Sequence, residues 1–452
     1  MNSRPSQQPT FDMQVVFKTW WPLAASWLMM GAELPVLSAV VARLADPEIN
    51  LAAYGGIVFP LALIIESPVI MLLAASTALC KDWVSYLKIR RFMMVTAGAM
   101  TGIHVLIAFT PLYYVVVEGI LNAPAEIVEP ARVGMMIMTP WTWAIAYRRF
   151  NQGVLIRFGH SQTITIGTLI RLSTDVLVLG FGYLIGSIPG IIVAASAVAL
   201  SVIAEATYVG VVVRPVLNNQ LKLEPPVEDP LTLRSFLNFY IPLAMTSLLT
   251  LLALPIGSAA IGRMPLSLPS LAVWPVISGL VFMFRSLGVA YNEVVVALLD
   301  KLGSSSDLRK FAIRLALFSS LALGVMAITP LSVLWFDTVS GLSPNLVEMA
   351  RIALWLAIPL PAMAAMQSWY QGALLFGRKT KGITEAVVIY LLSITILLLL
   401  GVIWGEVTGL YVALLAMGLS MAVQTGWLWF RSQRIRKSVQ IRDGLTLAET
   451  AM

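Results

Sequence analysis

Long apolar stretches alternate with short polar or Pro/Gly-bearing breaks along almost the whole chain. A helix needs about 20 apolar residues to cross the hydrocarbon core of a bilayer. Twelve stretches reach that length, at residues 14–42, 52–80, 92–117, 131–157, 163–186, 189–214, 236–262, 270–299, 311–336, 346–376, 383–404 and 407–430. The pattern therefore predicts an all-α integral membrane protein with twelve transmembrane helices.

Composition excludes several other classes of protein. The 452 residues are 58% hydrophobic and 12% charged, with a mean hydropathy of +0.85, whereas soluble domains are about half apolar and about a quarter charged. A net charge of +7 is too dilute for a phosphate-binding face, so we expect no nucleic-acid partner. With Cys80 as the only cysteine, and with only His104 and His160 as histidines, we expect no disulfide, metal site or bound cofactor.

Lysine and arginine are distributed unevenly between the two sets of predicted loops. The set that includes the N-terminus holds 22 of these residues, the other set holds 4 and the spans hold 4, which accounts for all 30. Short basic loops stay in the cytosol. We therefore expect a multi-pass protein of the cell (inner or plasma) membrane with both termini cytosolic.

The chain contains an internal repeat. Shifting the sequence by 219 residues lays Val128–Leu155 over Val347–Leu374 with nine identities in 28 positions, where chance gives about two. The repeat predicts two pseudo-symmetric six-helix lobes around a central cavity. The expected divisions are an N-terminal cytosolic tail (1–13), an N-lobe (14–217), a cytosolic linker (218–235), a C-lobe (236–431) and a C-terminal cytosolic tail (432–452).

Ionisable residues inside the predicted spans are the main candidates for a transport site, because each costs at least about 2.5–3.5 kcal/mol without a partner or a water-filled cavity. Arg171 and Asp175 lie at i, i+4 and could neutralise one another, whereas Arg285 has no acid within four residues. Structural ion pairing with a neighbouring helix is the alternative for each arginine. The predicted substrate-binding residues are Arg148, Arg149, Gln152, Arg171, Arg285, Asn292 and Gln371.

Carboxylates beside prolines are candidates for ion coupling. Glu33 and Glu66 each precede a proline by two residues. Because proline removes a backbone hydrogen bond, carbonyls such as those of Gly31 and Ile64 could be left free to bind a cation. Each glutamate could instead neutralise the first-lobe arginines. The predicted coupling residues, for H⁺ or Na⁺, are Glu33, Glu66, Asp175 and Glu293, although solvation at a helix end is an equal alternative for Glu293.

A repeated motif carries a resemblance to known transporters. Phe150-Asn-Gln-Gly-Val-Leu155 and Trp369-Tyr-Gln-Gly-Ala-Leu374 resemble the aromatic-x-Gln-Gly-x-Leu pattern of the MOP exporter superfamily, which contains multidrug and toxin extrusion (MATE) proteins and lipid II and polysaccharide flippases. Within it, the chain most resembles the progressive ankylosis family, through Trp20–Leu23, Ala53–Gly55, His104–Ala108 and Asn292-Glu293. The resemblance implies a MATE-like fold and the export of anionic metabolites such as citrate, nucleotides or pyrophosphate.

These features predict a monomeric secondary active exporter rather than an enzyme, since neither a Walker motif nor a catalytic Ser/His/Asp set is present in the sequence. The expected partners are a small anionic substrate, a coupling cation and membrane lipids. Two alternatives remain open within the same fold. One is a lipid-linked glycan or lipid flippase, which a lateral opening and a long apolar groove would support. The other is a cation-coupled multidrug pump, against which the embedded arginines count.

Overall fold

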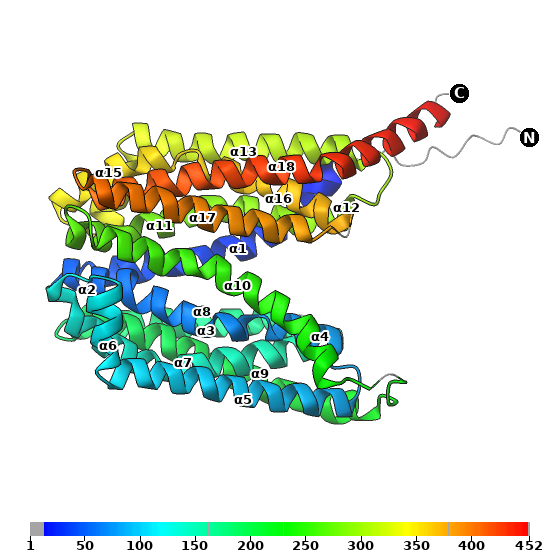
Figure 1. Ribbon diagram of the computed structural model, residues 1–452, viewed down its shortest axis with the longest axis horizontal. Helices are drawn as coiled ribbons and strands as arrows, with labels where there is room; N and C mark the ends of the chain where they lie inside the picture. The colour runs from blue at the N-terminus through cyan, green and yellow to red at the C-terminus, as the bar shows by residue number, and fades with distance from the viewer. Residues whose placement is uncertain (1–12, 161, 229, 378, 451–452) are drawn as a thin grey trace, which may run out of the picture.

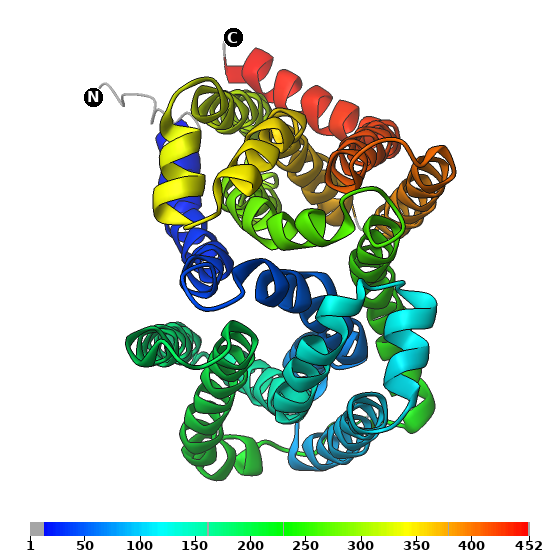
Figure 2. The same cartoon turned by 90° about the vertical axis from the view of Figure 1, so that its left-hand side faces the viewer.

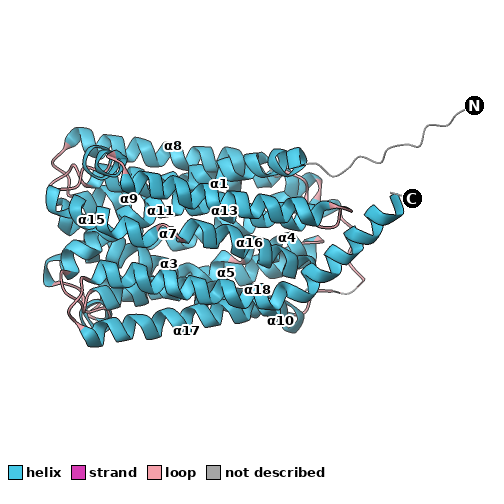
Figure 3. Ribbon diagram, turned by 90° about the horizontal axis from the view of Figure 1, so that it is seen from above, coloured by secondary structure: helices cyan, strands magenta, loops and turns pink. Residues whose placement is uncertain are grey.

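The computed structural model describes residues 13–160, 162–228, 230–377 and 379–450, and every regular element within them is a helix (Figure 3). The first half of the chain contains α1 (Met13–Val41), α2 (Pro47–Ala52), η1 (Ala53–Val58), α3 (Phe59–Ile70), α4 (Leu72–Leu79), α5 (Trp83–Phe109), α6 (Leu112–Tyr114), η2 (Val115–Ile120), α7 (Ala125–Arg157), α8 (Gln162–Ile185), α9 (Gly190–Asn219) and η3 (Leu221–Leu223). The second half contains α10 (Leu233–Ile261), α11 (Ser267–Val289), α12 (Tyr291–Leu298), α13 (Ser304–Ile328), α14 (Leu331–Val333), η4 (Leu334–Val339), α15 (Pro344–Ala357), α16 (Leu360–Phe376), α17 (Lys381–Trp404) and α18 (Gly409–Thr450). The elements η1, η2 and η4 are π-helical turns.

Eleven helical segments of the described residues are long and apolar enough to cross a membrane. The remaining predicted span, 131–157, lies within α7, which is 33 residues long. Its length suffices for a crossing, but charged residues such as Arg148 and Arg149 lower its hydropathy. The charges that make α7 a candidate site are therefore also the reason that it falls outside the apolar set.

Several helix boundaries differ from the sequence prediction, among them those of α5 and α18. The span expected at 92–117 begins earlier, at Trp83, because Asp82 and Ser85 form a capping box at the start of α5. At the other end of the chain, α18 continues to Thr450, so most of the predicted tail is helical. The predicted N-terminal tail lies outside the described residues, apart from Met13 at the start of α1.

The offset of 219 residues recurs in the helices themselves. It relates the first residue of α7 to that of α15, and likewise α8 to α17, α9 to α18 and η2 to η4. The break between α3 and α4 at Met71 recurs between α11 and α12 at Ala290. The two halves are thus built alike, except that the single helix α7 corresponds to α15 and α16, and the single helix α11 to α2, η1 and α3.

The helices form two groups that lie side by side along their long axes (Figures 1 and 2). We call the end that contains the start of α1 and the end of α18 the terminal end, and the opposite end, with η2 and η4, the far end (Figure 1). Most buried apolar residues form one continuous cluster that reaches from η1 and α7 through α11 to α15 and α18.

The first helix of each half packs against the other half. In α1, a Cβ atom on Gly31 would lie 3.3 Å from the ring of Phe282 in α11. In η1, a Cβ atom on Gly55 would lie 2.4 Å from Cγ of Pro275, also in α11. In the other direction, the hydroxyl of Tyr240 in α10 donates to the carbonyl of Pro68 in α3. Glycine thus allows helix backbones of the two halves to approach closely.

Candidate functional site

One face of α7 carries a buried cation and amide that share an acid. Arg148 and Gln152 lie at i, i+4, and both side chains point to Glu205 on α9. The guanidinium of Arg148 forms an ion pair with Oε2 of Glu205, and Nε2 of Gln152 donates to Oε1 at 2.9 Å. All three residues are at least 93% buried, with exposures of 7%, 2% and 1%. Arg148 and Gln152, both predicted to bind substrate, are therefore brought together by Glu205, which is not among the predicted site residues.

Arg171 on α8 extends this cluster to α1. Its Nη1 lies 2.8 Å from Oε2 of Glu33, and its Nε lies 3.5 Å from Oε2 of Glu205. The charges thus form a chain from Glu33 through Arg171 and Glu205 to Arg148, across four helices. Arg171 does not pair with Asp175, as the i, i+4 spacing suggested, because acids on neighbouring helices approach its guanidinium instead.

Two first-half carboxylates are buried without a recorded ion pair among the described residues. Asp175 is 1% exposed and its Oδ1 has no hydrogen-bond partner there, and Glu66 is 4% exposed and its Oε2 has none. Arg148 and Arg149 are the cations whose charges act on Glu66. An isolated buried carboxylate is costly unless it binds a proton or a cation. Asp175 and Glu66 therefore join Glu33, which is paired with Arg171, as carboxylates that could exchange a cation.

The carbonyls expected to be free beside the prolines are not both available. Ser67 donates its hydroxyl to the carbonyl of Ile64 at 2.8 Å. Pro35, the other proline, does not end its helix, since α1 continues past it to Val41. A carbonyl site for a cation beside Pro68 would therefore have to displace Ser67.

Arg149 and Arg285 differ from the other two embedded arginines. Neither takes part in an ion pair within the described part of the chain, whereas Arg148 and Arg171 do. Both residues are partly exposed, although their Nε atoms are buried. Tyr390 on α17 is the titratable group that interacts electrostatically with Arg285. Of the embedded arginines in the described residues, one without an ion pair therefore lies in each half.

The remaining predicted residues lie near the terminal end of the second half. Asn292 on α12 donates from Nδ2 to Oε1 of Gln371 on α16 at 3.3 Å, so the structure brings these two together. Glu293 is exposed, and it has no recorded ion pair or hydrogen bond in the described residues. This arrangement agrees with the solvated alternative for Glu293.

The glycines of the repeated Gln-Gly motif mark two equivalent helix contacts. A Cβ atom on Gly153 would lie 1.9 Å from Oγ of Ser76 and 2.3 Å from the carbonyl oxygen of Leu73, so α7 touches the start of α4. A Cβ atom on Gly372 would lie 2.6 Å from Cβ of Val295 in α12. The motif therefore packs α7 against α4 in the first half and α16 against α12 in the second. In each half, the contacted helix is the segment that follows the break in the second span.

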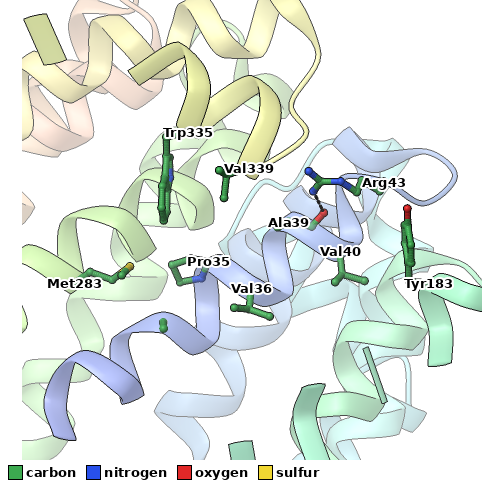
Figure 4. A pocket seen from close by; sticks show the side chains of 10 residues that line it. Pro35, Val36, Ala39, Val40, Arg43, Tyr183, Met283, Trp335 and Val339 are labelled. Atoms are coloured by element: carbon green, nitrogen blue, oxygen red, sulfur yellow. Dashed lines mark hydrogen bonds between the residues drawn. The ribbon is translucent and has the colours of Figure 1, made fainter. Parts of the chain in front are cut away.

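A mainly apolar groove with a volume of about 440 Å³ lies at the seam between the halves (Figure 4). Its walls come from α1, α8, α11 and η4, and Figure 4 shows Pro35 of α1 near Met283 and Trp335. Arg43 and Tyr183 lie at one end of the groove. A groove of this kind fits an alkyl chain better than a charged solute.

Glu205 is the site residue that is missing from the predicted set. It lies in the middle of a largely apolar helix, and it binds residues of α7 and α8 that are 53, 57 and 34 positions away. Its internal position in α9 was the available signal, but a single sequence does not say which helices surround α9. Within the described residues there is no cluster of histidine, cysteine or acidic side chains that could hold a metal ion.

The fold is similar to those of several solved membrane transporters. No protein-family model matches the chain, and no curated protein sequence matches it. The lipid II flippase MurJ in an inward closed conformation superposes with a TM-score of 0.67 at 14% identity, over 94% of this chain and 91% of the other. An inward-facing MATE multidrug transporter of the MOP superfamily gives 0.62 at 15% identity, over 92% and 99%. A mutant of the Vibrio cholerae MATE transporter VcmN gives 0.62 at 17% identity, over 94% and 97%.

The chain has the MATE-like fold. It is an all-helical, multi-pass membrane protein, as the sequence predicted, and it shares its fold with the transporters of the MOP superfamily reported above. A Pyrococcus furiosus transporter of that superfamily, described as having a binding pocket of reversed polarity that suggests a different function, also superposes, with a TM-score of 0.56 at 15% identity over 95% and 97% of the two chains.

Proposed function

We propose that the protein is a secondary active exporter that moves an anionic organic solute by alternating access, coupled to a cation gradient. The observation that carries the proposal is the pair of unpaired, partly exposed arginines, Arg149 in the first half and Arg285 in the second. A cation in a partly desolvated site attracts an anion more strongly than a cation in bulk water does. A substrate with two separated anionic groups, such as citrate, pyrophosphate or a nucleotide, could engage both halves.

The charges of the first-half cluster link anion binding to cation binding. Three arginines face four acids there, namely Glu33, Glu66, Asp175 and Glu205. When every group is ionised, the acids outnumber the cations by one. Uptake of H⁺ or Na⁺ by one carboxylate, such as Asp175, Glu66 or Glu33, makes the cluster neutral and so removes its net repulsion of an anion. Such linkage between two ligands is the requirement for coupled transport.

The outward direction rests on the resemblance to exporters and on the membrane potential. With both termini in the cytosol, as the loop charges predict, an inside-negative potential favours exit of an anion. We further propose that the lobes span 14–217 and 236–431, that the protein acts as a monomer in the cell membrane, and that it is related to the progressive ankylosis family.

A flippase for a lipid or a lipid-linked glycan is the second candidate. The apolar groove of about 440 Å³ beside α1 favours it, as does the likeness to MurJ, a lipid II flippase. A pump for cationic drugs is less well supported, because Arg149 and Arg285 would have to lie in or beside its cavity. The Pyrococcus furiosus protein described above supports the idea that pocket polarity can differ within this fold.

Direct binding to the purified protein tests the proposal. Radiolabelled citrate, ATP and pyrophosphate are titrated in detergent, and the variants Arg149→Gln and Arg285→Gln are compared with Arg351→Gln. We expect each of the first two to weaken binding by about tenfold or more, and Arg351→Gln to have no effect. Arg351 is the matched control because it pairs with Glu348 on its own helix. Unchanged anion binding by Arg149→Gln/Arg285→Gln would overturn the proposal.

A further inference from the structure

An arginine that follows the first helix of the chain reaches across to the other half at the far end. Nη1 of Arg43 donates to the carbonyl of Ala39 in α1 at 2.6 Å, which fixes the orientation of the guanidinium. Its Nη2 donates to the carbonyl of Thr338 in η4, a π-helical turn of the second half. Arg43 therefore ties the end of α1 to the opposite half.

The second half returns the same contact. Nη1 of Arg263, which follows α10, donates to the carbonyl of Ala259 at 2.7 Å. Its Nη2 donates to the carbonyl of Ile120 at 2.7 Å and its Nη1 to that of Leu121 at 3.2 Å, at the end of η2 in the first half. The two arginines are 220 residues apart, as are Ala39 and Ala259. We call these reciprocal contacts the far-end clasps.

The carbonyls that accept these bonds are suited to a cation. The last carbonyls of a helix have no intrahelical donor, and they form the negative end of its dipole. The chain then turns through a left-handed residue in each half, Asn122 with φ 53° and Gly341 with φ 70°. At Gly341 a Cβ atom would lie 3.1 Å from Nη1 of Arg43, so the absence of a side chain leaves room for the guanidinium.

Another reciprocal pair joins the halves nearer the terminal end. Nε1 of Trp20 in α1 donates to the carbonyl of Leu287 in α11 at 2.9 Å, and the hydroxyl of Tyr240 in α10 donates to the carbonyl of Pro68 in α3. The donors are 220 residues apart and the acceptors 219. Each first helix is therefore bound to the opposite half at two levels, by an aromatic residue toward the terminal end and by an arginine at the far end.

We propose that Arg43 and Arg263 are the two halves of a gate at the far end, and that both clasps must break before a solute can leave there. This inference rests on the proposed alternating access. Separation of the halves at the far end would pull Arg43 from Thr338 and Arg263 from Ile120, since each arginine is fixed to its own helix. The arginines act on conformation and have no part in binding the substrate.

Distances between spin labels test the gate. Labels at Glu126→Cys and Asn345→Cys lie at equivalent, exposed positions near the starts of α7 and α15, one in each half. A control pair, Glu126→Cys and Ser187→Cys, lies within the first half, and a third pair, Lys81→Cys and Asp300→Cys, reports on the terminal end. The native Cys80 is buried, and burial raises the pKa of its thiol to about 12. The Cys80 thiol should therefore react poorly with the spin label. All labelled variants carry Cys80→Ser, which removes that thiol.

In Arg43→Gln/Arg263→Gln, we expect a new population with a longer distance across the far end. The ratio of open to closed molecules should rise about tenfold or more, as for the loss of hydrogen bonds from charged donors. The within-half distance should stay unchanged, and Arg351→Gln, which removes a far-end charge that binds only its own helix, should behave like the parent. Tyr240→Phe should lengthen the terminal-end distance instead.

The possible outcomes separate this gate from the proposed function. If the far-end distribution of the double variant matches that of the parent while anions still bind and move, the gate is wrong and the exporter stands. If the far end opens but no anion binds to the parent protein, the gate stands and the proposed function is wrong. Both arginines are exposed, so the variants should fold, and unchanged elution in size-exclusion chromatography checks this.

Discussion

Nε2 of Gln367 donates to Oε1 of Gln424 at 3.1 Å, and so joins α16 to α18. At the offset of 219 residues, these two positions correspond to Arg148 and Glu205, whose ion pair joins α7 to α9. The second half thus keeps the link between its fourth and sixth helices with neutral amides. Because the fold does not need charges at these positions, the charges of the first half call for a functional explanation.

The first prediction is that Glu205→Gln destabilises the protein and that a second change repairs it. The single variant leaves Arg148 buried without its acid, which typically costs about 3–5 kcal/mol. Arg148→Gln/Glu205→Gln recreates the amide pair of the second half and should recover most of that stability. Thermal unfolding in detergent measures both variants. A double variant no more stable than Glu205→Gln would show that the two halves do not pack equivalently here.

The second prediction concerns the glycine of the repeated motif. In Gly153→Ala the new methyl would lie 2.3 Å from the carbonyl oxygen of Leu73, so α7 and α4 must move apart. Overpacking of this kind costs about 1–3 kcal/mol. Gly102→Ala in α5 is the matched control, because nothing lies within 4 Å of the position that its new methyl would take and alanine favours a helix. Equal melting temperatures of the two variants would contradict the close contact.

The third prediction links stability to pH through the cap of α5. Burial raises the pKa of Asp82, but hydrogen bonds from Ser85 and from the backbone of Val227 outweigh it, so the net pKa lies below the ordinary value. A lowered pKa in the folded state means that the stabilisation is present above about pH 4 and is lost as the pH falls through the folded-state pKa. Asp82→Ala should cost about 1 kcal/mol at pH 7.

Unfolding of the parent and of Asp82→Ala between pH 7 and pH 3 measures this effect. The other acids titrate in both proteins, so the difference between the two isolates Asp82. The difference should shrink as the pH falls. A difference that is constant with pH would mean that the ionised carboxylate of Asp82 does not stabilise the start of α5.

The sequence predicted the elements of this fold better than the partners of its charges. Apolar length and the 219-residue repeat sufficed to predict the helices. The first is a property of a local stretch of sequence, and the second comes from comparing the sequence with itself. The partner of Arg171 could not be predicted in this way. Asp175 was the nearest acid along the helix, whereas Glu33 and Glu205 approach from α1 and α9. Likewise, the pattern placed Arg43 and Arg263 in loops, but only the three-dimensional arrangement shows that each binds the opposite half.

The last prediction assigns different roles to Glu33 and to the arginines of the proposed anion site. Glu33 on α1 binds Arg171 on α8, and α1 packs against α11 of the second half. The ion pair therefore links a helix that adheres to the second half with a helix of the first half. Glu33→Gln removes the charge and mimics the protonated acid, so this link should stay weak throughout the cycle. We expect loss of gradient-driven efflux, whereas anion binding survives because Arg149 and Arg285 are untouched.

Efflux from proteoliposomes under an imposed proton or sodium gradient, together with anion binding in detergent, measures the two effects separately. Glu66→Gln should reduce efflux less, because no ion pair of Glu66 is recorded among the described residues. Asp175→Asn serves as the comparison within the same cluster, since Asp175 is buried and its Oδ1 has no hydrogen-bond partner there. Full gradient-driven efflux by Glu33→Gln, with loss of efflux in Asp175→Asn, would move the coupling role to Asp175. That result would make Glu33 a structural partner of Arg171, because only a carboxylate that exchanges its cation during the cycle can couple transport to the gradient.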